Sequence, residues 1–559
     1  MDYVSLAVEE IERVVKKSLN DIFEEESLKN KYFKFLVELS EREEFGDFAT
    51  NVAMVAAKIF RKPPVVLAES IVKNISFENS FFERCEVKKP GFINFFLKDS
   101  WFVEVLKNVL EEKELFGRTD YGKNKKVILE FVSANPTGPM HIGNARGGAI
   151  GDALAECYKF AGFFVVKEFY VNDAGNQIAK FKNSLFFRYE QLTGSKKEEY
   201  MPDGYYLGED IIKHVENFLM ENGNKISSCS DEEKKEALLN YALPINIKNL
   251  KLDLLKYNVE YDNWFFESDL YKKDEVLKIV YMLKEKGYAY EKDGAVWFSF
   301  TKCSGEKDEV LVRDSGVPTY FASDIAYHYD KFEKRGFDLA INVWGADHHG
   351  HVERLKAALK VLGVRGSLEV VLMQMVRLVN DGETLKLSKR LGNTISLNDL
   401  LNIIPIDVAR FFFNMKEPNS HFDFDLNLAK QQSEKNPVYY VQYAYARICG
   451  ILKNLNEESF VPNLNSDFYL LKTPEEKQLI KHMAKFPYEI KNVVQTNNPA
   501  RIVHFTMEFA TLFHKFYVNC KIKGQEQDVL NARLCLCFAV KEVLYNIFSI
   551  LKIKAKEEV

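Results

Sequence analysis

Residues 127–162 read VILEFVSANPTGPMHIGNARGGAIGDALAECYKFAG and decide the fold. An apolar strand over Val127–Val132 runs into a turn rich in proline and glycine, and a helix of small residues begins near His141. A strand, a short turn and a helix form the unit of a doubly wound parallel sheet, which binds ligands at the carboxyl ends of its strands. Because residues 133–144 follow such an end, we expect a ligand site there.

A second unit of the same kind lies near residue 340. A strand over Leu339–Trp344 is followed by the turn GADHHG, the helical stretch VERLKAALKVLG and another strand, LEVVLMQMV. The two units predict an α/β doubly wound, Rossmann-like catalytic domain over residues 119–405. Between them, residues at about 185–300 are richer in charge, with runs such as SKKEEY and SDEEKKEALL. We expect an insertion there.

The regions on either side of this domain differ from it in pattern. Residues 1–118 begin with an amphipathic helix and continue to a strand-like KKPGFINFFL, which predicts an N-terminal α+β domain. After Pro405 strand signals almost vanish, so residues 406–559 predict an all-α C-terminal domain. Asn436 before Pro437 is typical of a helix start, with a cap followed by proline in the first turn.

The composition is that of a globular protein and excludes several classes. The chain has 559 residues, 47% of them hydrophobic, and a formal net charge of −5. This argues against a disordered or fibrous protein and against wholesale electrostatic binding of nucleic acid. We expect no membrane contact, since no apolar run approaches the ~18–20 residues of a membrane span. The eight cysteines are scattered without zinc spacing, which predicts reduced thiols in a cytoplasmic protein.

The loop after the first strand has the features of a nucleotide site. Four glycines between residues 143 and 151 keep the start of the helix bare, so that a phosphate could approach the backbone amides and the positive end of the helix dipole. His141 and Asn144 lie on one face of the first turn, from which both could donate hydrogen bonds to phosphate oxygens. The alternative is a glycine-rich helix packed tightly on the sheet, with His141 as its cap.

Two other segments invite a phosphate-binding interpretation. Gly117–Asn124 nearly spells a phosphate loop, but Asn124 stands where Mg²⁺ needs Ser or Thr, and the segment precedes a strand instead of following one. A linker turn explains it better. The stretch Lys386-Leu-Ser-Lys-Arg390 follows a hairpin signal, Asn380-Asp-Gly382, and so lies on a loop. Taken alone, such a basic stretch is usually solvated surface, although lysines on a loop could also offset phosphate charge.

Together these motifs resemble the class I aminoacyl-tRNA synthetases. That family carries an H-I-G-H signature, here His141-Ile-Gly-Asn144 with Asn144 in place of the usual second histidine, and a K-M-S-K-S signature, here residues 386–390. Within the class, the chain is similar to the arginyl-tRNA synthetase family. The stretches that carry this similarity are EFGD (44–47), PGFIN (90–94), EFVSANPTGP (130–139), DSGVPTYFASDIAY (314–327), VWGADHHG (343–350) and NPVYYVQYAYAR (436–447).

The resemblance implies ligation of L-arginine to tRNA(Arg) through an arginyl-adenylate, with release of AMP and pyrophosphate. ATP with Mg²⁺ would be a substrate, adenylation would require bound tRNA, and no tightly bound cofactor is expected. We expect no metal site, although His348, His349 and His351 cluster, because no cysteine or carboxylate completes a tetrahedral set nearby. The protein is expected to act as a monomer.

The resemblance also assigns residues to roles. The residues expected to act in catalysis are His141, Asn144, Lys386 and Lys389. Those expected to bind ATP are Thr137, Gly138, His141, Gly143, Asn144, Gly345, Asp347, Ser388 and Lys389. Those expected to bind arginine are Glu130, Ser133, Asn135, Tyr320, Asp324 and His348. Independently, carboxylates such as Glu130 and Asp324 suit a planar guanidinium, although Asp324 could instead be a helix cap.

Residues for tRNA are expected in both flanking domains. They are Phe45, Asp47 and Asn51 in the N-terminal domain, and Tyr439, Tyr443 and Arg447 in the helical one. The last three form a stripe along one helix, which in a bare sequence is more often core packing than a platform for stacked bases. Residues 406–559 hold 20 Lys and Arg against 17 Asp and Glu, which leaves −8 on the rest, so the helical domain is the less repulsive surface for RNA.

Two other functions stay open on the sequence. A small-molecule nucleotidylyltransferase could share the nucleotide-binding fold, although it would need no helical RNA platform. A non-catalytic RNA-binding relative is the second, because Asn144 cannot become cationic as a histidine can.

Overall fold

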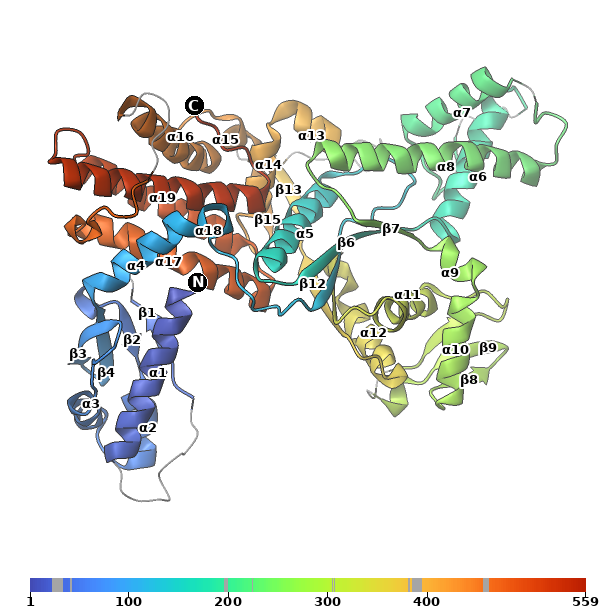
Figure 1. The fold of residues 1–559 in the computed structure, drawn as a ribbon. Coiled ribbons are helices and arrows are strands. Elements are labelled where there is room, and N and C mark those ends of the chain that lie inside the picture. Colours follow the sequence, from blue (N-terminus) through green and yellow to red (C-terminus); the bar gives the residue numbers. More distant parts are fainter. Residues whose placement is uncertain are drawn as a thin grey trace.

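The computed structural model of the chain is drawn as a ribbon in Figure 1. It describes residues 1–22, 34–40, 43–195, 200–223, 225–303, 305, 307–380, 383–384, 395–455 and 462–558. Lys386, Ser388 and Lys389, which carry the second predicted signature, lie outside the described residues.

The N-terminal region is an antiparallel sheet covered by helices. Its four strands have the order β1-β2-β4-β3, and they are β1 (Val37–Leu39), β2 (Phe48–Thr50), β3 (Phe82–Lys88) and β4 (Phe92–Leu97). The helices are α1 (Tyr3–Ile22), α2 (Val52–Phe60) and α3 (Pro64–Lys73). Helix α1 turns Val4, Ala7, Ile11 and Val15 into the core, as its 3.6-residue period predicts. The expected α+β fold is confirmed.

The centre of the molecule is a parallel five-stranded sheet of order β12-β11-β5-β6-β7. The strands are β5 (Lys126–Glu130), β6 (Phe164–Val171), β7 (Asn263–Phe266), β11 (Leu339–Gly345) and β12 (Ser367–Met373). Helix α5 (Ile142–Phe160) joins β5 to β6, and α12 (His349–Leu362) joins β11 to β12. The chain leaves β5 on one side and returns beside it as β11, so the strand order reverses there. This is the doubly wound arrangement predicted, with its ligand crevice at the carboxyl ends of β5 and β11.

Two separate insertions interrupt this sheet, unlike the single insertion expected over about 185–300. The first, between β6 and β7, is a helical projection of α6 (Gly175–Leu192), α7 (Glu209–Asn222) and α8 (Asp231–Lys256). The second is a small subdomain of α9 (Ser268–Lys272), α10 (Glu275–Glu285), the antiparallel strands β8 (Ala289–Lys292), β9 (Ala295–Phe298) and β10 (Glu309–Val312), and α11 (Tyr320–Tyr329). Strand β7 lies between them in the chain and belongs to the central sheet. Its four residues are too short a signal to stand out from their charged surroundings.

The C-terminal region is helical but not free of strands. Its main helices are α14 (Ile406–Phe413), α16 (Pro437–Leu455), α17 (Pro474–Thr496), α18 (Ala500–Asn519) and α19 (Gln527–Leu551), preceded by α13 (Leu397–Ile403). The expectation of an all-helical segment after Pro405 misses β15 (Phe422–Asp425), which pairs in parallel with β13 (Val376–Asn380). Helix α16 begins at Pro437, as predicted. Strands β13 and β14 (Glu383–Thr384) pair antiparallel, as the predicted hairpin requires, although residues 381 and 382 of its turn lie outside the described residues.

Helix α19 corrects the expectation that no apolar segment reaches membrane length. It is long and apolar enough to cross a membrane, but 72% of its most apolar window is buried inside the protein. It packs on α16, α17, α4 (Asp99–Glu112) and α5. This is the environment of a core helix.

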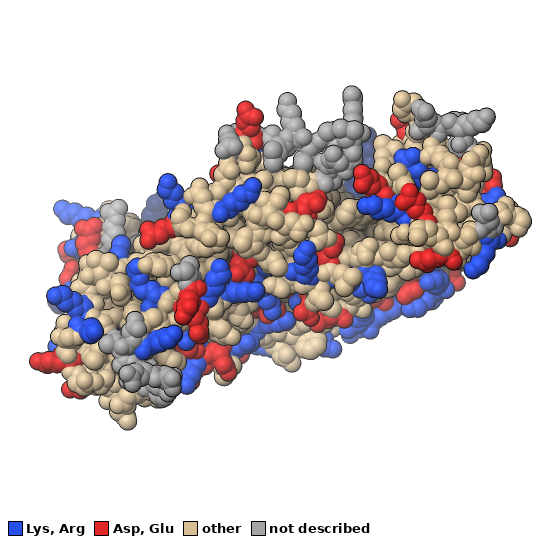
Figure 2. All heavy atoms as spheres, turned by 90° about the horizontal axis from the view of Figure 1, so that it is seen from above, with Lys and Arg blue, Asp and Glu red and all other residues tan. Residues whose placement is uncertain are grey.

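Charge on the surface is mixed. On the face drawn in Figure 2, basic and acidic side chains are interspersed along the whole length of the molecule. The net charge of −5 is therefore no guide to any single part of this face.

Candidate active site

The turn after β5 has an unusual backbone conformation. Val132 and Ser133 have φ angles of 69° and 39°, a region that a β-branched residue rarely occupies, so surrounding contacts must hold it. Ser133 supplies two of them: its Oγ donates to Oε1 of Glu130 (3.1 Å) and accepts from the backbone N–H of Tyr170 in β6 (3.1 Å). The turn directs residues 133–140 across the carboxyl edge of the sheet. We refer to these eight residues as the ligand loop.

Helix α5 begins with a reciprocal cap between two predicted catalytic residues. Nδ1 of His141 accepts from the Gly143 N–H (3.1 Å), and Oδ1 of Asn144 accepts from the His141 N–H (3.0 Å). Desolvation lowers the pKa of His141, so its ring is neutral at pH 7 and, with Nδ1 as acceptor, carries its proton on Nε2. His141 therefore caps helix α5, as the alternative interpretation of the sequence has it. Its Nε2–H is still available to donate to a ligand.

The chain after the second predicted signature returns to this helix start. Ser396 forms a short antiparallel bridge with His141, and the Leu397 N–H donates to the carbonyl of Met140 (2.8 Å). The residues that directly follow the undescribed segment 385–394 therefore lie beside the first turn of α5.

The glycines of α5 serve packing more than ligand approach. A Cβ on Gly151 would lie 2.1 Å from Cγ of Phe131, and one on Gly148 would lie 3.5 Å from the ring of Tyr257. Gly147 faces Met373. All three glycines are buried, so the expectation that they bare the helix for a nucleotide is wrong, and the tight-packing alternative holds for them. Gly143, in the first turn, is partly exposed.

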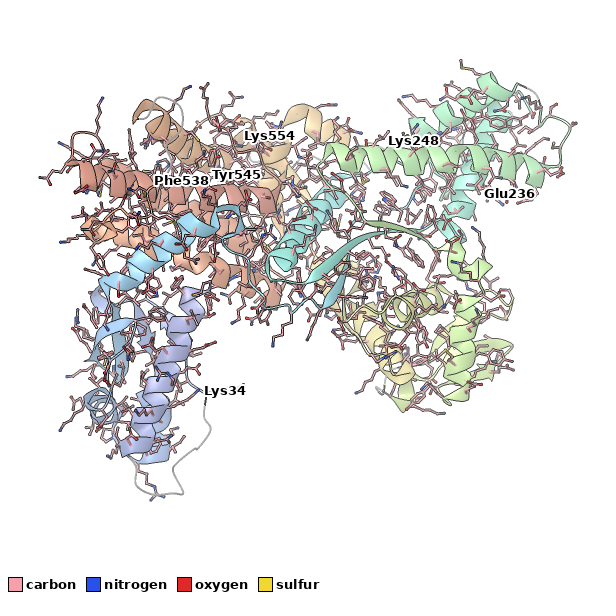
Figure 3. All side chains as sticks on the ribbon, in the orientation of Figure 1. Lys34, Glu236, Lys248, Phe538, Tyr545 and Lys554 are labelled. Atoms are coloured by element: carbon pink, nitrogen blue, oxygen red, sulfur yellow. The ribbon has the colours of Figure 1, made fainter. Side chains whose placement is uncertain are left out.

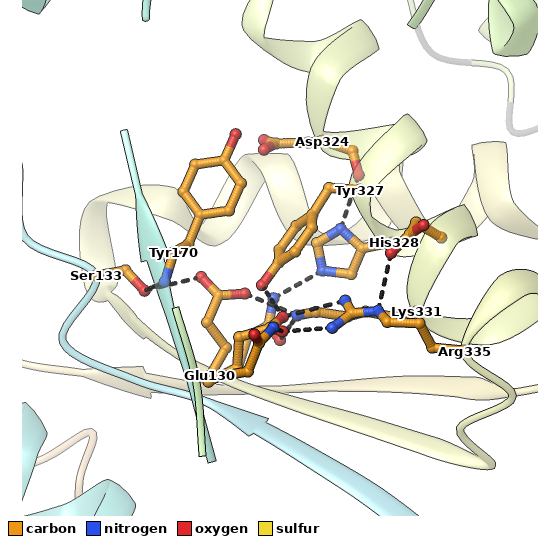
Figure 4. Close-up of polar contacts among 12 residues, drawn as sticks. Glu130, Ser133, Tyr170, Asp324, Tyr327, His328, Lys331 and Arg335 are labelled. Atoms are coloured by element: carbon orange, nitrogen blue, oxygen red, sulfur yellow. Dashed lines mark hydrogen bonds and ion pairs between the residues drawn. The ribbon is translucent and has the colours of Figure 1, made fainter. Parts of the chain in front are cut away.

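The carboxylate of Glu130, predicted to hold a guanidinium, already has a cation. Glu130 is 5% exposed, and its Oε2 accepts from Nζ of the fully buried Lys331 (2.8 Å). Lys331 also donates to Asn342 in β11 (3.2 Å). Figure 4 shows this pair beneath the side chains of Tyr170 and Tyr327. Glu130 therefore presents a largely neutralised carboxylate to the site.

Two other carboxylates, those of Asp324 and Glu267, line one cavity and lie close enough to interact electrostatically. Asp324 on α11 accepts at Oδ2 from Nε2 of His351 on α12 (2.7 Å). Glu267, which directly follows β7, is 1% exposed, and Tyr271 donates to its Oε1 (3.1 Å). Burial and the nearby charge of Asp324 raise the pKa of Glu267 to about 7. A cationic ligand between these two groups would relieve that repulsion.

One cavity of about 990 Å³ collects most of the predicted residues. It is lined by Glu130, Ser133, Asn135, Thr137, Gly138, His141, Asn144, Tyr320, Asp324, Gly345, Asp347 and His348. Of the predicted arginine and ATP contacts that the structure describes, only Gly143 is not part of this lining. The hydroxyl of Tyr320 accepts from the Asn176 N–H (2.9 Å), which fixes the ring at the cavity edge.

Several lining residues were not predicted from the sequence, among them Glu267, His351, Asp210 and Tyr206. Glu267 directly follows the apolar residues WFF of β7. A carboxylate at the end of an apolar strand is therefore the sequence signal that could have identified it. His351 lies in the histidine cluster, whose spacing suggests only a metal site. Asp210 and Tyr206 belong to the helical projection, and nothing in the sequence indicates that it reaches the cavity. Among the described residues, no group of three or more His, Cys, Asp or Glu is arranged to hold a metal ion.

The predicted tRNA residues of the N-terminal region differ in accessibility. Phe45 is 40% exposed. Asp47 accepts from the Leu97 N–H (2.9 Å) and pairs with Lys481 on α17 (2.9 Å), so its carboxylate is used within the protein. Asn51 accepts from the Leu36 N–H (2.9 Å). Asp47 and Asn51 therefore make hydrogen bonds that stabilise the N-terminal region, besides any contact with RNA.

The stripe on α16 is partly exposed: Tyr439 packs against the core, and Tyr443 and Arg447 pack against α18. The guanidinium of Arg447 lies over the ring of Tyr443 (4.4 Å) and over that of Tyr517 on α18 (4.7 Å). Nη1 of Arg447 lies 3.3 Å from Nδ1 of His514. Tyr439 faces Nζ of Lys556 (5.1 Å). Such stacked rings and cations are the kind of surface on which unpaired bases bind.

Family models match nearly the whole chain. The arginyl tRNA synthetase N terminal domain matches residues 9–97, the catalytic domain of the class I (R) tRNA synthetases matches 105–425, and the DALR anticodon binding domain matches 441–559.

Curated relatives and solved structures agree with these matches. The arginine–tRNA ligase of Caldanaerobacter subterraneus is 50% identical over 99% of both chains, and that of Acetivibrio thermocellus is 48% identical over 98% of both. A putative arginyl-tRNA synthetase structure from Campylobacter jejuni superposes with a TM-score of 0.75 at 32% identity, covering 83% of this chain and all of that one. The Thermus thermophilus arginyl-tRNA synthetase has the same fold, with a TM-score of 0.75 at 20% identity over 99% of this chain and 100% of that one.

Proposed function

The chain belongs to the arginyl-tRNA synthetase family of class I aminoacyl-tRNA synthetases, and from that premise we propose how its residues carry the reaction. The enzyme ligates L-arginine to tRNA(Arg) through an arginyl-adenylate. The two alternative functions, a nucleotidylyltransferase and a non-catalytic relative, are thereby set aside.

The arginine guanidinium binds between Asp324 and Glu267 in this proposal. The observation that carries it is the pair of neighbouring carboxylates, one buried and with its pKa raised to about 7, at the wall of the 990 Å³ cavity. A planar cation with five donors can serve both, and Tyr320 borders the same wall. Glu130, already paired with Lys331, contacts the α-amino group of the arginine substrate together with Ser133 and Asn135. His348 lines the same site.

ATP occupies the other half of the cavity, next to the start of α5. Thr137, Gly138 and Gly143 border the phosphates, and the side-chain amide of Asn144 and the Nε2–H of His141 donate to them. Gly345 and Asp347, at the end of β11, face the adenosine. Ser388 and Lys389, with Lys386, act on the phosphates. The support for this is the bridge between Ser396 and His141, because Ser396 follows Lys389 by seven residues in the chain. Mg²⁺ would enter with ATP, held by phosphate oxygens and water, and would offset the phosphate charge.

The chemistry needs no protein nucleophile. An oxygen of the arginine carboxylate attacks the α-phosphorus of ATP in line, the bond to the β-phosphate oxygen breaks, and pyrophosphate leaves. The 2′-hydroxyl of the terminal tRNA ribose then attacks the arginyl carbonyl and releases AMP. The protein contributes position and charge stabilisation: His141 and Asn144 donate to the reacting phosphate, and the lysines 386 and 389 offset the charge on the leaving group.

The tRNA is held at both ends of the molecule in this proposal. Anticodon bases stack on the cluster of Tyr443, Arg447 and Tyr517, with Tyr439 beside it, and Phe45, Asp47 and Asn51 border the surface for the tRNA elbow. We propose a cytoplasmic monomer; its eight cysteines are all free thiols, as expected in a reducing compartment.

Replacing Glu267 tests the arginine site. Glu267→Gln keeps the size of the side chain and removes its charge, so the KM for arginine should rise about 10- to 100-fold, the value of a charge-assisted hydrogen bond. The KM for tRNA should not change. Asp269→Asn, two residues further along the chain in helix α9 and paired with Lys272 at the surface, is the matched control. An unchanged arginine KM in Glu267→Gln would place the guanidinium elsewhere.

A further inference from the structure

Two polar side chains of the helical projection are buried against the ligand loop. His214 in α7 and Asn246 in α8 are 7% and 6% exposed, and Nε2 of His214 lies 2.7 Å from Oδ1 of Asn246. Nδ2 of Asn246 in turn donates to the carbonyl oxygen of Pro136 (3.0 Å). Helix α8 runs from the tip of the projection, where Figure 3 labels Glu236, towards the sheet, where it labels Lys248. Asn246 therefore lies on the part of α8 that faces the catalytic domain.

The direction of this chain of hydrogen bonds follows from chemistry. A carbonyl oxygen can only accept, so the amide nitrogen of Asn246 must face Pro136, and its oxygen is left for His214. His214 then donates from Nε2, which defines its tautomer. Each donor and acceptor in this chain is thus defined. Loss of His214 would allow the side-chain amide of Asn246 to rotate.

The carbonyl of Pro136 has no partner in a regular ladder. The ligand loop contains neither a helix nor an extended strand, so no ladder supplies an N–H to this buried oxygen, and it depends on a side-chain donor. Elsewhere the loop is held by Ser133 at its start and through the Met140 carbonyl at its end. Asn246 supplies the contact in its middle, between Asn135 and Thr137.

We propose that His214 and Asn246 are positioning residues for aminoacylation: the helical projection holds the ligand loop in its reactive conformation through the His214–Asn246–Pro136 chain. The inference rests on the proposed roles of Asn135 towards arginine and Thr137 towards ATP. The projection thereby gains a role in the chemical step, besides lining the cavity with Tyr206 and Asp210.

Isosteric variants separate the two hydrogen bonds. Asn246→Asp keeps an acceptor for His214 but loses the donor to Pro136. His214→Phe keeps the ring that meets Phe181 edge-on (6.4 Å) and loses the donor to Asn246, whereas His214→Gln can still donate. Tyr241→Phe is the matched control, since it removes a hydrogen bond between α8 and Glu221 of α7 (2.9 Å) at the exposed side of the projection.

Aminoacylation kinetics and the thermal midpoint of each full-length variant give the readout. We expect kcat/KM for arginine and for ATP to fall about tenfold in Asn246→Asp and His214→Phe, because a small misplacement of a binding loop is costly in rate. The double variant should be no worse than Asn246→Asp alone, as for groups that act as one unit. His214→Gln and Tyr241→Phe should stay within about twofold of wild type, and the KM for tRNA should not move.

Three results would overturn the proposal. They are an unchanged kcat/KM in Asn246→Asp, an equal loss in Tyr241→Phe, and losses that simply follow the thermal midpoint across all variants. Asn135→Ala and Thr137→Ala, assayed alongside, test the proposed loop contacts separately. If these two are impaired and Asn246→Asp is not, the chain of hydrogen bonds is irrelevant; if these two are neutral, the assigned roles of the loop are wrong.

Discussion

At the residue scale, the hydrogen bond between Asp324 and His351 should make arginine binding at the proposed site depend on pH. Burial alone would lower the pKa of His351, but the hydrogen bond and the charge of Asp324 raise it above its ordinary value. At low pH the imidazolium neutralises Asp324 and competes with the substrate. As the pH rises through the raised pKa, His351 loses its proton and Asp324 becomes available to the guanidinium. Glu267, with a pKa of about 7, ionises over the same range and acts in the same direction.

We therefore expect the KM for arginine to fall several-fold between about pH 6 and pH 8.5 in the wild type. His351→Gln keeps a neutral donor to Asp324 and should make this dependence shallower, and His351→Gln combined with Glu267→Gln should remove it. Steady-state aminoacylation at saturating ATP and tRNA measures it. His349→Gln, two residues away and exposed, is the control. A wild-type KM that rises with pH would contradict the assignment.

At the element scale, the glycines of α5 can be separated by one substitution. Gly151→Ala forces a Cβ against Phe131 (2.1 Å) and should destabilise the protein by about 1–3 kcal/mol, the range for overpacking. Gly147→Ala makes only ordinary contact, 3.6 Å from Met373, and should be neutral or stabilising by up to about 1 kcal/mol, because alanine favours the helix. Denaturant midpoints of the two variants, compared with the wild type, test this. Equal midpoints would show that α5 can shift away from the sheet.

The sequence predicts a helix or strand well where the pattern lies in one continuous stretch, and poorly where the element depends on contacts with distant residues. The strand, turn and helix of residues 127–162 lie in one continuous stretch, so the sheet, its carboxyl edge and the loop residues could all be placed. Strand β15 reads FDFD and pairs with β13, about fifty residues earlier in the chain, so nothing local reveals its partner. Glu267 and Asn246 reach the site only because β7 and α8 fold back onto β6 and the ligand loop, and no single sequence carries such long-range contacts.

At the scale of the whole molecule, a buried ion cluster joins the catalytic and helical regions. Asp152 on α5 pairs with Arg410 on α14 (2.6 Å) and with Lys167 on β6 (3.0 Å). Arg410 also donates to the carbonyls of Leu551, at the end of α19, and of Tyr257, after α8. Four segments distant in the sequence thus meet at one guanidinium. Although burial by itself would raise the pKa of Asp152, Arg410 and Lys167 hold it below the ordinary value.

Removing the charge of Asp152 should therefore loosen the whole assembly. Asp152→Asn leaves two buried cations without a counter-ion and should cost about 3–5 kcal/mol, whereas Asp423→Asn, which breaks the exposed pair with Arg377, should cost under about 1 kcal/mol. Because the folded-state pKa of Asp152 is depressed, its stabilisation is complete above the unfolded value of about 3.9 and is lost as the pH falls through the folded pKa. The gap in denaturant midpoint between wild type and Asp152→Asn should stay constant from about pH 5 to pH 8 and narrow only in stronger acid. A gap that already closes at pH 6 would mean that Asp152 is protonated in the native protein and that Arg410 is held by the carbonyls alone.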